Sequence, residues 1–405
     1  MTEQLKLKLN DSKATRWGAL VIVAFTMMAA YYVNDVVAPL KTMLETDLAW
    51  SSTDFGFFTG GYSFLNVFFL MLIWGGLILD RFGIRFTGKL ATILMVGGTA
   101  LEYYAMTGLA GADATLFGIN EIFGYKTGVF VAFAGYSIFG VGAEVAGITV
   151  SKIIAKWFKG KELATAMGVQ VALARIGSQA GYAVAIPLAR AFGISTPVLL
   201  GLVLLLGGMI AFFIFAVMDK KLDKQMEAAA IAAGTEDEEE KFSFKDVKNI
   251  LVNPGFWLIA LLCVLFYSCV FPFQKFASEL MIIKYGINEN VAGTFAGLPA
   301  LGALILTPVF GGFIDKRGKS ASIMLLGSAM LICVHFIYAI PDINYWLVAI
   351  VLMIILGIAF SLVPSAMWPA VAKIFPVSQL GTAYALIFFI QNIGLWGIPT
   401  LIGWV

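Results

Sequence analysis

Histidine, cysteine and charge are all scarce in this sequence of 405 residues. The single histidine is His335, and the three cysteines, Cys263, Cys269 and Cys333, lie in apolar runs without the spacing of a metal site. The glycine-rich loops contain no Walker pattern, and no nucleophile elbow is present. We therefore expect no enzymatic activity, no metal and no cofactor.

Charged residues make up 13% of the chain, whereas hydrophobic residues make up 60%. No soluble domain needs that much apolar sequence, so the composition predicts a polytopic membrane protein surrounded by the lipid bilayer. The net charge of +2 says little about partners, and we expect no nucleic-acid partner. The polar segment 1–17 has no apolar core of its own, so we expect the first spanning helix, and no cleavable signal peptide, to direct targeting.

Eleven apolar runs are long enough to span a hydrocarbon core, which is about 30 Å thick. They fall near 17–40, 54–79, 87–110, 127–153, 161–190, 196–219, 254–284, 290–314, 320–340, 344–373 and 378–405. The sequence thus predicts an all-α membrane protein. Residues 1–219 would form an N-terminal six-helix half, 220–252 a charged cytoplasmic linker with an amphipathic piece, and 253–405 a C-terminal half whose last helix is absent from this chain.

Lysine and arginine are concentrated in alternate loops. Basic residues cluster before residue 17 and in the segments 81–89, 156–161 and 316–319, whereas the opposite loops are poorer in them. The positive-inside rule then predicts that the N-terminus and the acidic linker lie in the cytoplasm.

Two pairs of stretches repeat along the chain. Residues 76–83 and 311–318 both read G-x-x-x-D-[RK]-x-G, and ELATAMG at 162–168 matches QLGTAYA at 379–385. In the second register Glu144 corresponds to Ser361, and Arg175 to Asn392. The sequence therefore predicts two six-helix halves in parallel pseudo-twofold repeat, and substrate sites in such folds lie at the midplane between the halves.

Glu144 and Arg175 each interrupt an apolar helical run on either side of the basic turn 156–162. Both lie roughly 14 residues from that turn, so a rise of ~1.5 Å per residue places each ~20 Å from the same surface. A charge at that depth is costly and indicates a functional site.

The first repeated stretch resembles the loop signature of the major facilitator superfamily. WFKGKEL at 157–163, ARIGS at 174–178, VFPF at 270–273 and IQNIGL at 390–395 resemble, more narrowly, the lysosomal dipeptide transporter branch and its bacterial relatives. The resemblance implies uptake of dipeptides without a strict side-chain preference. Uniport and proton coupling both remain open as the mode of transport.

The same resemblance assigns the acidic residue of that branch to Glu144, its arginine to Arg175 and its glutamine–asparagine pair to Gln391 and Asn392. The N-terminal tail lacks an acidic dileucine sorting signal, and the one glycosylation sequon of the chain, at residues 10–12, lies on the predicted cytoplasmic side. A bacterial inner membrane is therefore favoured over a lysosomal one, and we expect a monomer.

A dipeptide is a zwitterion, so its binding needs a cation for the carboxylate and an anion or carbonyls for the amine. Arg175 offers a bidentate fork for the carboxylate, and Glu144 is the candidate for the ammonium and for a coupled proton. The alternative is that these two residues only pair with each other and lock their helices together.

Several polar and aromatic residues complete the predicted site. Gln391 and Asn392 would bind peptide amides or merely link helices; Asn66 and Tyr62 share one helical face; and Trp368 precedes a proline that frees backbone groups. Tyr62 and Trp368 each have an alternative structural role, as an interfacial aromatic and in simple packing.

Other charged residues have predicted roles in coupling or gating. Asp35 is a candidate for proton coupling or gating, and Glu102 and His335 are weaker candidates. Lys275 and Glu279 are interpreted as an ordinary i,i+4 pair in preference to an outer gate. Asp80 and Asp315, with Arg81 and Lys316 beside them, would close the cytoplasmic side by lying near the N-termini of helices in the opposite half.

Three functions remain open from the sequence. The first is a carrier of dipeptides or small peptides that works by alternating access. The second is a carrier of another small organic anion or amino acid, and the third is a non-transporting membrane sensor on the same fold.

Overall fold

The computed structural model describes residues 8–111, 114–158, 161–233, 244–375 and 377–405. Nearly all of them are helical. The helices are α1 (Lys13–Val36), α2 (Lys41–Asp47), α3 (Ser52–Phe68), α4 (Met71–Thr107), α5 (Thr127–Trp157), α6 (Leu163–Phe192), α7 (Thr196–Ala233), α8 (Phe244–Val252), α9 (Pro254–Ile283), α10 (Glu289–Ala296), α11 (Leu298–Arg317), α12 (Ser320–Ala339), α13 (Trp346–Ile374) and α14 (Val377–Trp404). Short 3-10 turns occur at Leu9–Asp11 and Ala38–Leu40, and the strands β1 (Glu121–Ile122) and β2 (Tyr125–Lys126) form a small hairpin.

Each predicted span coincides with helix in the described chain, and one of these spans is bent. The run 54–79 is not one straight helix, because it breaks between α3 and α4 with a bend of 59°. Leu70, at the break, has a left-handed backbone (φ 54°). By length and composition, eight described helices can cross a membrane, or nine if this bent pair is one span. Helix α6 is not among them, and neither is the part of α4 that follows Gly83. Both segments carry charged and small residues.

The backbone carries the predicted repeat. Gly83, inside α4, has φ 73°, and Gly318, at the end of α11, has φ 67°. These are the last glycines of the two G-x-x-x-D-[RK]-x-G stretches, and only glycine adopts such angles without strain. In the other repeat, α5 ends at the C-cap Phe158 and α13 at the C-cap Phe375, which correspond in the predicted register.

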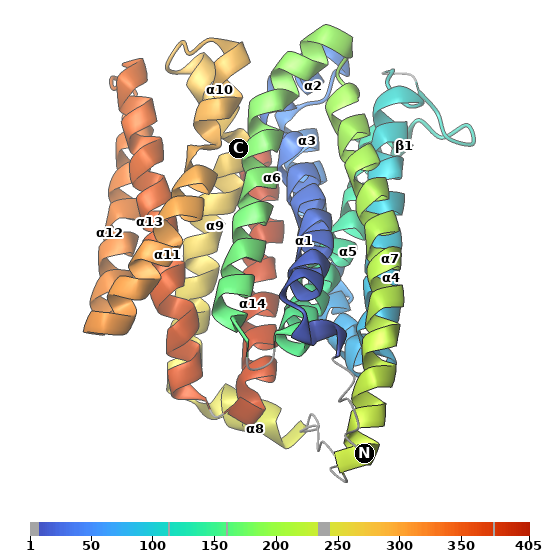
Figure 1. Cartoon of the computed structure of the whole chain (residues 1–405). Helices are drawn as coiled ribbons and strands as arrows, with labels where there is room; N and C mark the ends of the chain where they lie inside the picture. Colours follow the sequence, from blue (N-terminus) through green and yellow to red (C-terminus); the bar gives the residue numbers. More distant parts are fainter. Residues whose placement is uncertain (1–7, 112–113, 159–160, 234–243, 376) are drawn as a thin grey trace.

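The axes of the long helices are roughly aligned, and these helices extend between two ends of the molecule (Figure 1). The N-terminus and α8 lie at one end, which we call the N-terminal side. The other end, which we call the far side, carries α2, the hairpin and α10. The C-terminal end of α14 reaches the far side, where Gly403 contacts Gly56 of α3.

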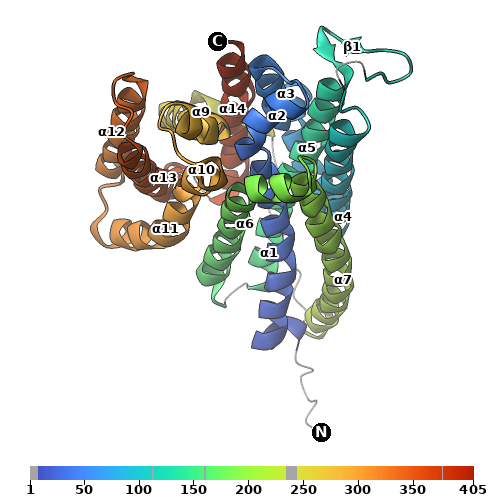
Figure 2. The same ribbon diagram turned by 90° about the horizontal axis from the view of Figure 1, so that it is seen from above.

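Buried apolar residues form two main clusters that divide the chain in the middle. One is built from residues of α1 to α7, and the other mainly from residues of α8 to α14, joined by Ala38 and Tyr182 from the first half. Figure 2 shows α9 to α13 gathered apart from α1, α4, α5 and α7. Helix α7 continues to Ala233, past the predicted start of the linker at 220, and α8 is the amphipathic piece predicted within that linker.

Candidate functional site

Arg175 lies on α6 and faces aromatic rings from both halves. Its guanidinium carbon is 5.4 Å from the ring centroid of Tyr31 on α1 and 4.9 Å from that of Phe360 on α13. Both distances are in the range of cation–π attraction. The side chain is half-buried. Arg175 therefore joins the two halves through an aromatic contact, and no described residue forms a hydrogen bond or ion pair with its guanidinium.

Glu144 lies on α5 and is held from α3. The Tyr62 hydroxyl donates a hydrogen bond of 3.1 Å to Glu144 Oε1. No ion pair within 4 Å joins Glu144 to Arg175 among the described residues. The interpretation that the two charges only pair with each other is thus wrong for this state of the protein. Tyr62 therefore positions the Glu144 carboxylate. The sequence analysis had left the role of Tyr62 open.

An aromatic group of the C-terminal half extends from Phe360 toward Trp368. Trp368 Nε1 donates to the Tyr267 hydroxyl over 3.2 Å, and the Trp368 ring stacks on Phe388 at 4.9 Å. The Tyr267 ring packs edge-on against Phe360, with 6.3 Å between centroids. This group gives the site an apolar wall from the C-terminal half, which Arg175 contacts through Phe360. The sequence analysis named Trp368 and missed Phe360, which adjoins Ser361, the counterpart of Glu144.

The predicted amide side chains are buried and incompletely bonded. Asn66 is 1% exposed, and neither its Oδ1 nor its Nδ2 has a partner among the described residues. Asn392, also 1% exposed, donates through Nδ2 to the carbonyl of Phe388, one turn earlier, and its Oδ1 has no described partner. Gln391 Oε1 accepts a bond from the Cys263 thiol at 3.4 Å, which links α14 to α9. Asn66 on α3 and Asn392 on α14 thus retain unused hydrogen-bonding capacity among the described residues, and their two helices pack against each other.

Four charged residues form ion pairs between the two halves on the far side, and we call them the far-side gate: Asp35, Lys41, Lys275 and Glu279. Lys275 Nζ lies 3.3 Å from Asp35 Oδ1, and Lys41 Nζ lies 2.5 Å from Glu279 Oε1. The i,i+4 interpretation of Lys275 and Glu279 was therefore wrong, because each side chain reaches across to the first half. Asp35 is also buried, at 7% exposure.

Glycines bring backbones together beside the far-side gate. A Cβ on Gly56 of α3 would lie 2.5 Å from the carbonyl oxygen of Pro399 and 2.8 Å from Cα of Gly403, both on α14. On the other side of the gate, a Cβ on Gly293 of α10 would lie 2.2 Å from the carbonyl oxygen of Tyr182 on α6. We call the contact of Gly56 with Pro399 and Gly403 the glycine seam. No larger residue fits at these positions without separating the halves.

On the N-terminal side the described ion pairs stay within the first half. Asp219 of α7, fully buried, accepts from Lys156 Nζ at 2.8 Å and from Trp157 Nε1 at 3.0 Å. Glu162, just before α6, accepts from Arg16 Nη2 at 3.0 Å and from Trp17 Nε1 at 3.1 Å. The sequence analysis did not identify these two carboxylates as anchors between helices.

These contacts lower the pKa values of two carboxyl groups that lie outside the membrane-spanning segments. The hydrogen bond from Arg16, and then that from Trp17, lowers the pKa of Glu162 below its usual value. Lys161 lowers the pKa of Asp11 in the same way, through a hydrogen bond of 2.5 Å. Both carboxylates are therefore more acidic in the folded protein.

The predicted cytoplasmic latch falls partly outside the described residues, since the side chains of Asp80 and Asp315 are not among them. Both backbone positions are helical. Arg81 and Lys316 are exposed, and the Arg81 guanidinium lies 5.5 Å from the Phe82 ring. The latch therefore stays a prediction.

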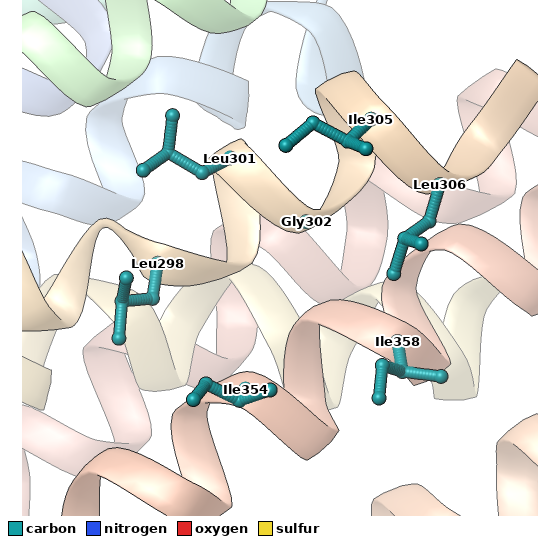
Figure 3. A pocket seen from close by; sticks show the side chains of 7 residues that line it. All are labelled: Leu298, Leu301, Gly302, Ile305, Leu306, Ile354 and Ile358. Carbon is teal, nitrogen blue, oxygen red and sulfur yellow. The ribbon is translucent and has the colours of Figure 1, made fainter.

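His335 and the open pocket on α11 lie apart from the charged residues. His335 on α12 has its two ring nitrogens 3.0 Å from the carbonyl oxygens of Leu331 and Cys269. A pocket of about 250 Å³ between α11 and α13 is lined by Leu298, Leu301, Gly302, Ile305, Leu306, Ile354 and Ile358 (Figure 3). With only aliphatic side chains and glycine around it, this pocket cannot bind a zwitterion.

A model of the Major Facilitator Superfamily matches residues 20–397. The chain is similar to the lysosomal dipeptide transporter MFSD1 of Homo sapiens, with 29% identity over 406 residues that cover 97% of this chain and 80% of that protein. It also resembles the inward open conformation of the xylose transporter XylE from E. coli, with a TM-score of 0.68 at 15% identity, covering 95% of this chain and 89% of that one. A bacterial homolog of the human lysosomal transporter Spinster, inward-facing and unoccupied, gives a TM-score of 0.65 at 16% identity, covering 96% and 82%. At these sequence identities the two solved structures support the fold of this chain and nothing finer.

Proposed function

The chain belongs to the Major Facilitator Superfamily, and we propose that this transporter carries dipeptides across a membrane by alternating access. The similarity to MFSD1 over 97% of the chain supports a peptide substrate. The observation that carries the proposal is that Arg175 and Glu144, one cation and one anion, are each held by aromatic residues and not by each other.

Arg175 binds the carboxylate of the dipeptide, and Glu144 binds its ammonium. The planar guanidinium can donate two parallel hydrogen bonds to a carboxylate while its face stays on the Phe360 ring. Glu144 keeps one oxygen, Oε2, free of the Tyr62 bond and can accept from an ammonium. The zwitterion is then oriented with its charged ends toward the N-terminal half.

The peptide group and the side chains face the C-terminal half and α3. Asn66 and Asn392 have unpaired amide atoms that can bond a peptide N–H or C=O. The wall of Phe360, Tyr267 and Trp368 supplies apolar contact of no particular shape, which suits side chains of different kinds.

The state described here is closed on the far side by the far-side gate. In our proposal the N-terminus is cytoplasmic, so the site opens next to the cytoplasm, and Asp80, Arg81, Asp315 and Lys316 close that side in the opposite state. Residues 1–219 and 253–405 move as two bodies joined by the linker 220–252. The protein acts as a monomer in a bacterial inner membrane, as a uniporter or with a proton carried by Glu144 or Asp35.

Flux into proteoliposomes tests the proposal. Purified protein reconstituted in liposomes should take up a labelled dipeptide, and unlabelled dipeptides with different side chains should compete while free amino acids and monocarboxylates should not. Competition by free amino acids or monocarboxylates alone would favour the carrier of another small anion or amino acid. Binding without flux in intact proteoliposomes would identify a sensor and overturn the proposal.

A further inference from the structure

A groove on the outer face of the first half contains one lysine and shares no residue with the proposed substrate site. The groove has a volume of about 490 Å³ and lies between α4 and α7. Its lining consists of one charged residue and five apolar ones: Lys89, Met209, Ile210, Phe213, Ile214 and Val217. The five apolar residues extend ~12 Å along α7, since each helical residue adds ~1.5 Å. The groove is thus an apolar strip with a cation at its edge.

Close contact between α4 and α7 forms the floor of this groove. The two helices lie next to each other at the edge of the bundle (Figure 2). A Cβ at Gly88 would collide with the buried Phe212 ring, so glycine is what lets this ring approach α4. The next residue on each helix then meets the other, because Lys89 Nζ lies 5.2 Å from the centroid of the Phe213 ring. Phe213 is nevertheless exposed, and so the groove stays open toward the surroundings of the protein.

Lys89 forms no ion pair with any carboxylate of the described residues, in contrast to Arg85 one turn earlier on α4. It follows Gly83 by six residues, which places it ~9 Å further along α4 and inside the segment predicted to span the bilayer. Six residues after Gly318, the corresponding glycine of the second half, the chain has Met324. An unpaired ammonium at that depth is costly. The apolar counterpart indicates that the fold itself does not require a charge there, so an anion from outside the chain would explain Lys89.

Positive charge continues the groove along α7 toward the N-terminal side. Three exposed lysines follow Val217 at i+3, i+4 and i+7, on the same helical face: Lys220, Lys221 and Lys224. The two acidic residues of this stretch, Asp219 and Asp223, already form ion pairs with cations of α4 and α5. The first acidic residue beyond them is Glu227. The apolar strip therefore ends in a positively charged surface, which is complementary to a molecule with an apolar tail and an anionic head.

We propose that this groove binds an anionic phospholipid from the leaflet on the N-terminal side. One acyl chain lies along the apolar strip of α7, and the phosphate accepts a charge-assisted hydrogen bond from Lys89 Nζ. The lysines at the end of the strip favour a headgroup with a net negative charge. A soluble anion would leave the exposed apolar strip without a contact, whereas the bilayer presents a lipid to this outward face. The bound lipid contacts both α4 and α7 and therefore stabilises their packing.

Native mass spectrometry of the full chain in detergent, titrated with dioleoylphosphatidylglycerol or dioleoylphosphatidylcholine, tests the headgroup contact. The parent should bind the anionic lipid more tightly than the zwitterionic one. Lys89→Met should weaken binding of the anionic lipid about fivefold, and Lys89→Arg should stay close to the parent. Lys373→Met is the matched control, because Lys373 is an exposed lysine on α13, outside the groove, and it should bind both lipids as the parent does. Equal binding of the two lipids by the parent, or equal losses in Lys89→Met and Lys373→Met, would overturn the proposal.

A bulky side chain in the groove tests the acyl-chain contact separately. Ile214→Trp should weaken binding of dioleoylphosphatidylglycerol although Lys89 is still present. Leu326→Trp on α12 should not, because Leu326 is as exposed as Ile214, at 55%, but lies outside the groove.

Glycerol phosphate distinguishes a lipid from a soluble phosphate ester. It should not displace the bound lipid, and the anionic lipid should raise the Tm of the parent more than that of Lys89→Met. Unchanged lipid binding in Ile214→Trp, displacement by glycerol phosphate, or equal Tm shifts would refute the proposal. These measurements need no transport substrate, so a failure of dipeptide flux would overturn the proposed function without changing them.

Discussion

Lys275 Nζ lies 3.3 Å from Asp35 Oδ1, although Lys275 belongs to α9 and Asp35 to α1. One turn further along α9, Glu279 reaches Lys41 of the first half. Lys275 and Glu279 have opposite charge and i,i+4 spacing, yet they do not pair with each other. Each forms an ion pair with a residue of the other half. Ion pairs between the two halves would control any separation of the halves more directly than pairs within one helix, because only the former break when the halves part.

Replacing Arg175 should weaken dipeptide binding. Arg175→Gln removes the carboxylate partner, and the loss of hydrogen bonds to a charged group corresponds to about 10- to 100-fold in affinity. Binding is measured by thermal shift against a dipeptide and its C-terminal amide. The amide should bind the parent weakly, and Arg175→Gln should no longer distinguish the two ligands. Arg317→Gln is the matched control, since Arg317 also lies over a ring, Phe313, but at the exposed end of α11.

Glu144 and Arg175 should be coupled through the substrate. Glu144→Gln and Arg175→Gln should each lower affinity, and the double variant should lose less than the sum of the two losses, because both ends of one zwitterion are involved. Isothermal titration of the four proteins with one dipeptide provides the cycle. If the double variant binds the dipeptide as well as the parent, the pair is structural and the site assignment is wrong.

Phe360 should influence affinity through Arg175. Phe360→Leu keeps apolar volume but removes the ring that lies 4.9 Å from the guanidinium, and a partly desolvated cation–π contact corresponds to about three- to thirtyfold in affinity. Phe360→Tyr should stay close to the parent. The measured quantity is the KM of dipeptide uptake. Equal effects of the leucine and tyrosine variants would show that ring volume, and not the cation–π contact, matters.

A side chain in the glycine seam should hold the far side open. Gly56→Leu cannot be accommodated against Pro399 and Gly403, so transport should stop while the dipeptide still binds from the far side. Gly397→Ala on α14 is the control, because a Cβ at Gly397 meets no atom within 4 Å. Uptake and binding are measured in parallel. Normal turnover of Gly56→Leu would mean that the seam does not close during transport.

Acid should weaken the contact of Glu162, which lies just before α6, with Arg16 and Trp17 of α1. The pKa of Glu162 is lowered in the folded protein, so its contribution is present above the unfolded value of about 4.5 and is lost as pH falls through the lower folded pKa. The Tm of the parent should therefore fall more steeply below pH 4.5 than the Tm of Glu162→Gln, and the two should converge at the acid end. Parallel Tm profiles from pH 7 to pH 3 would exclude this contribution.

The sequence predicted those features that depend on position along one helix. Depth in the bilayer follows from counting residues, and so Glu144 and Arg175 were identified as a pair of buried charges without any knowledge of packing. The glycines at 83 and 318 were identified because they end the same repeated motif, and both have a positive φ in the structure. The break between α3 and α4 was not predicted, because residues 69–71 are all apolar and carry no helix-ending signal.

Contacts across the two halves could not be obtained in this way. The distance between Arg175 and Phe360, or between Lys275 and Asp35, depends on how two bodies are placed, and helical periodicity carries no information about that. The i,i+4 spacing of Lys275 and Glu279 even favoured the wrong partner. The unpaired oxygens of Glu102 are visible only after every neighbouring donor has been placed.

The glycine seam has a consequence for how fast the carrier can turn over. At the glycine seam itself, backbone lies against backbone, so no side chain there has to change rotamer before the helices part. The resistance to opening at this end then comes from separating the ion pairs, whose partners become hydrated when they part, and from the ring contact between Phe55 and Phe276. Since the hydration of freed ions becomes less favourable as temperature rises, warming should accelerate opening less than it would at an interface of interdigitated side chains. The carrier should therefore keep a larger share of its turnover in the cold than one whose outer gate is closed by packed leucines.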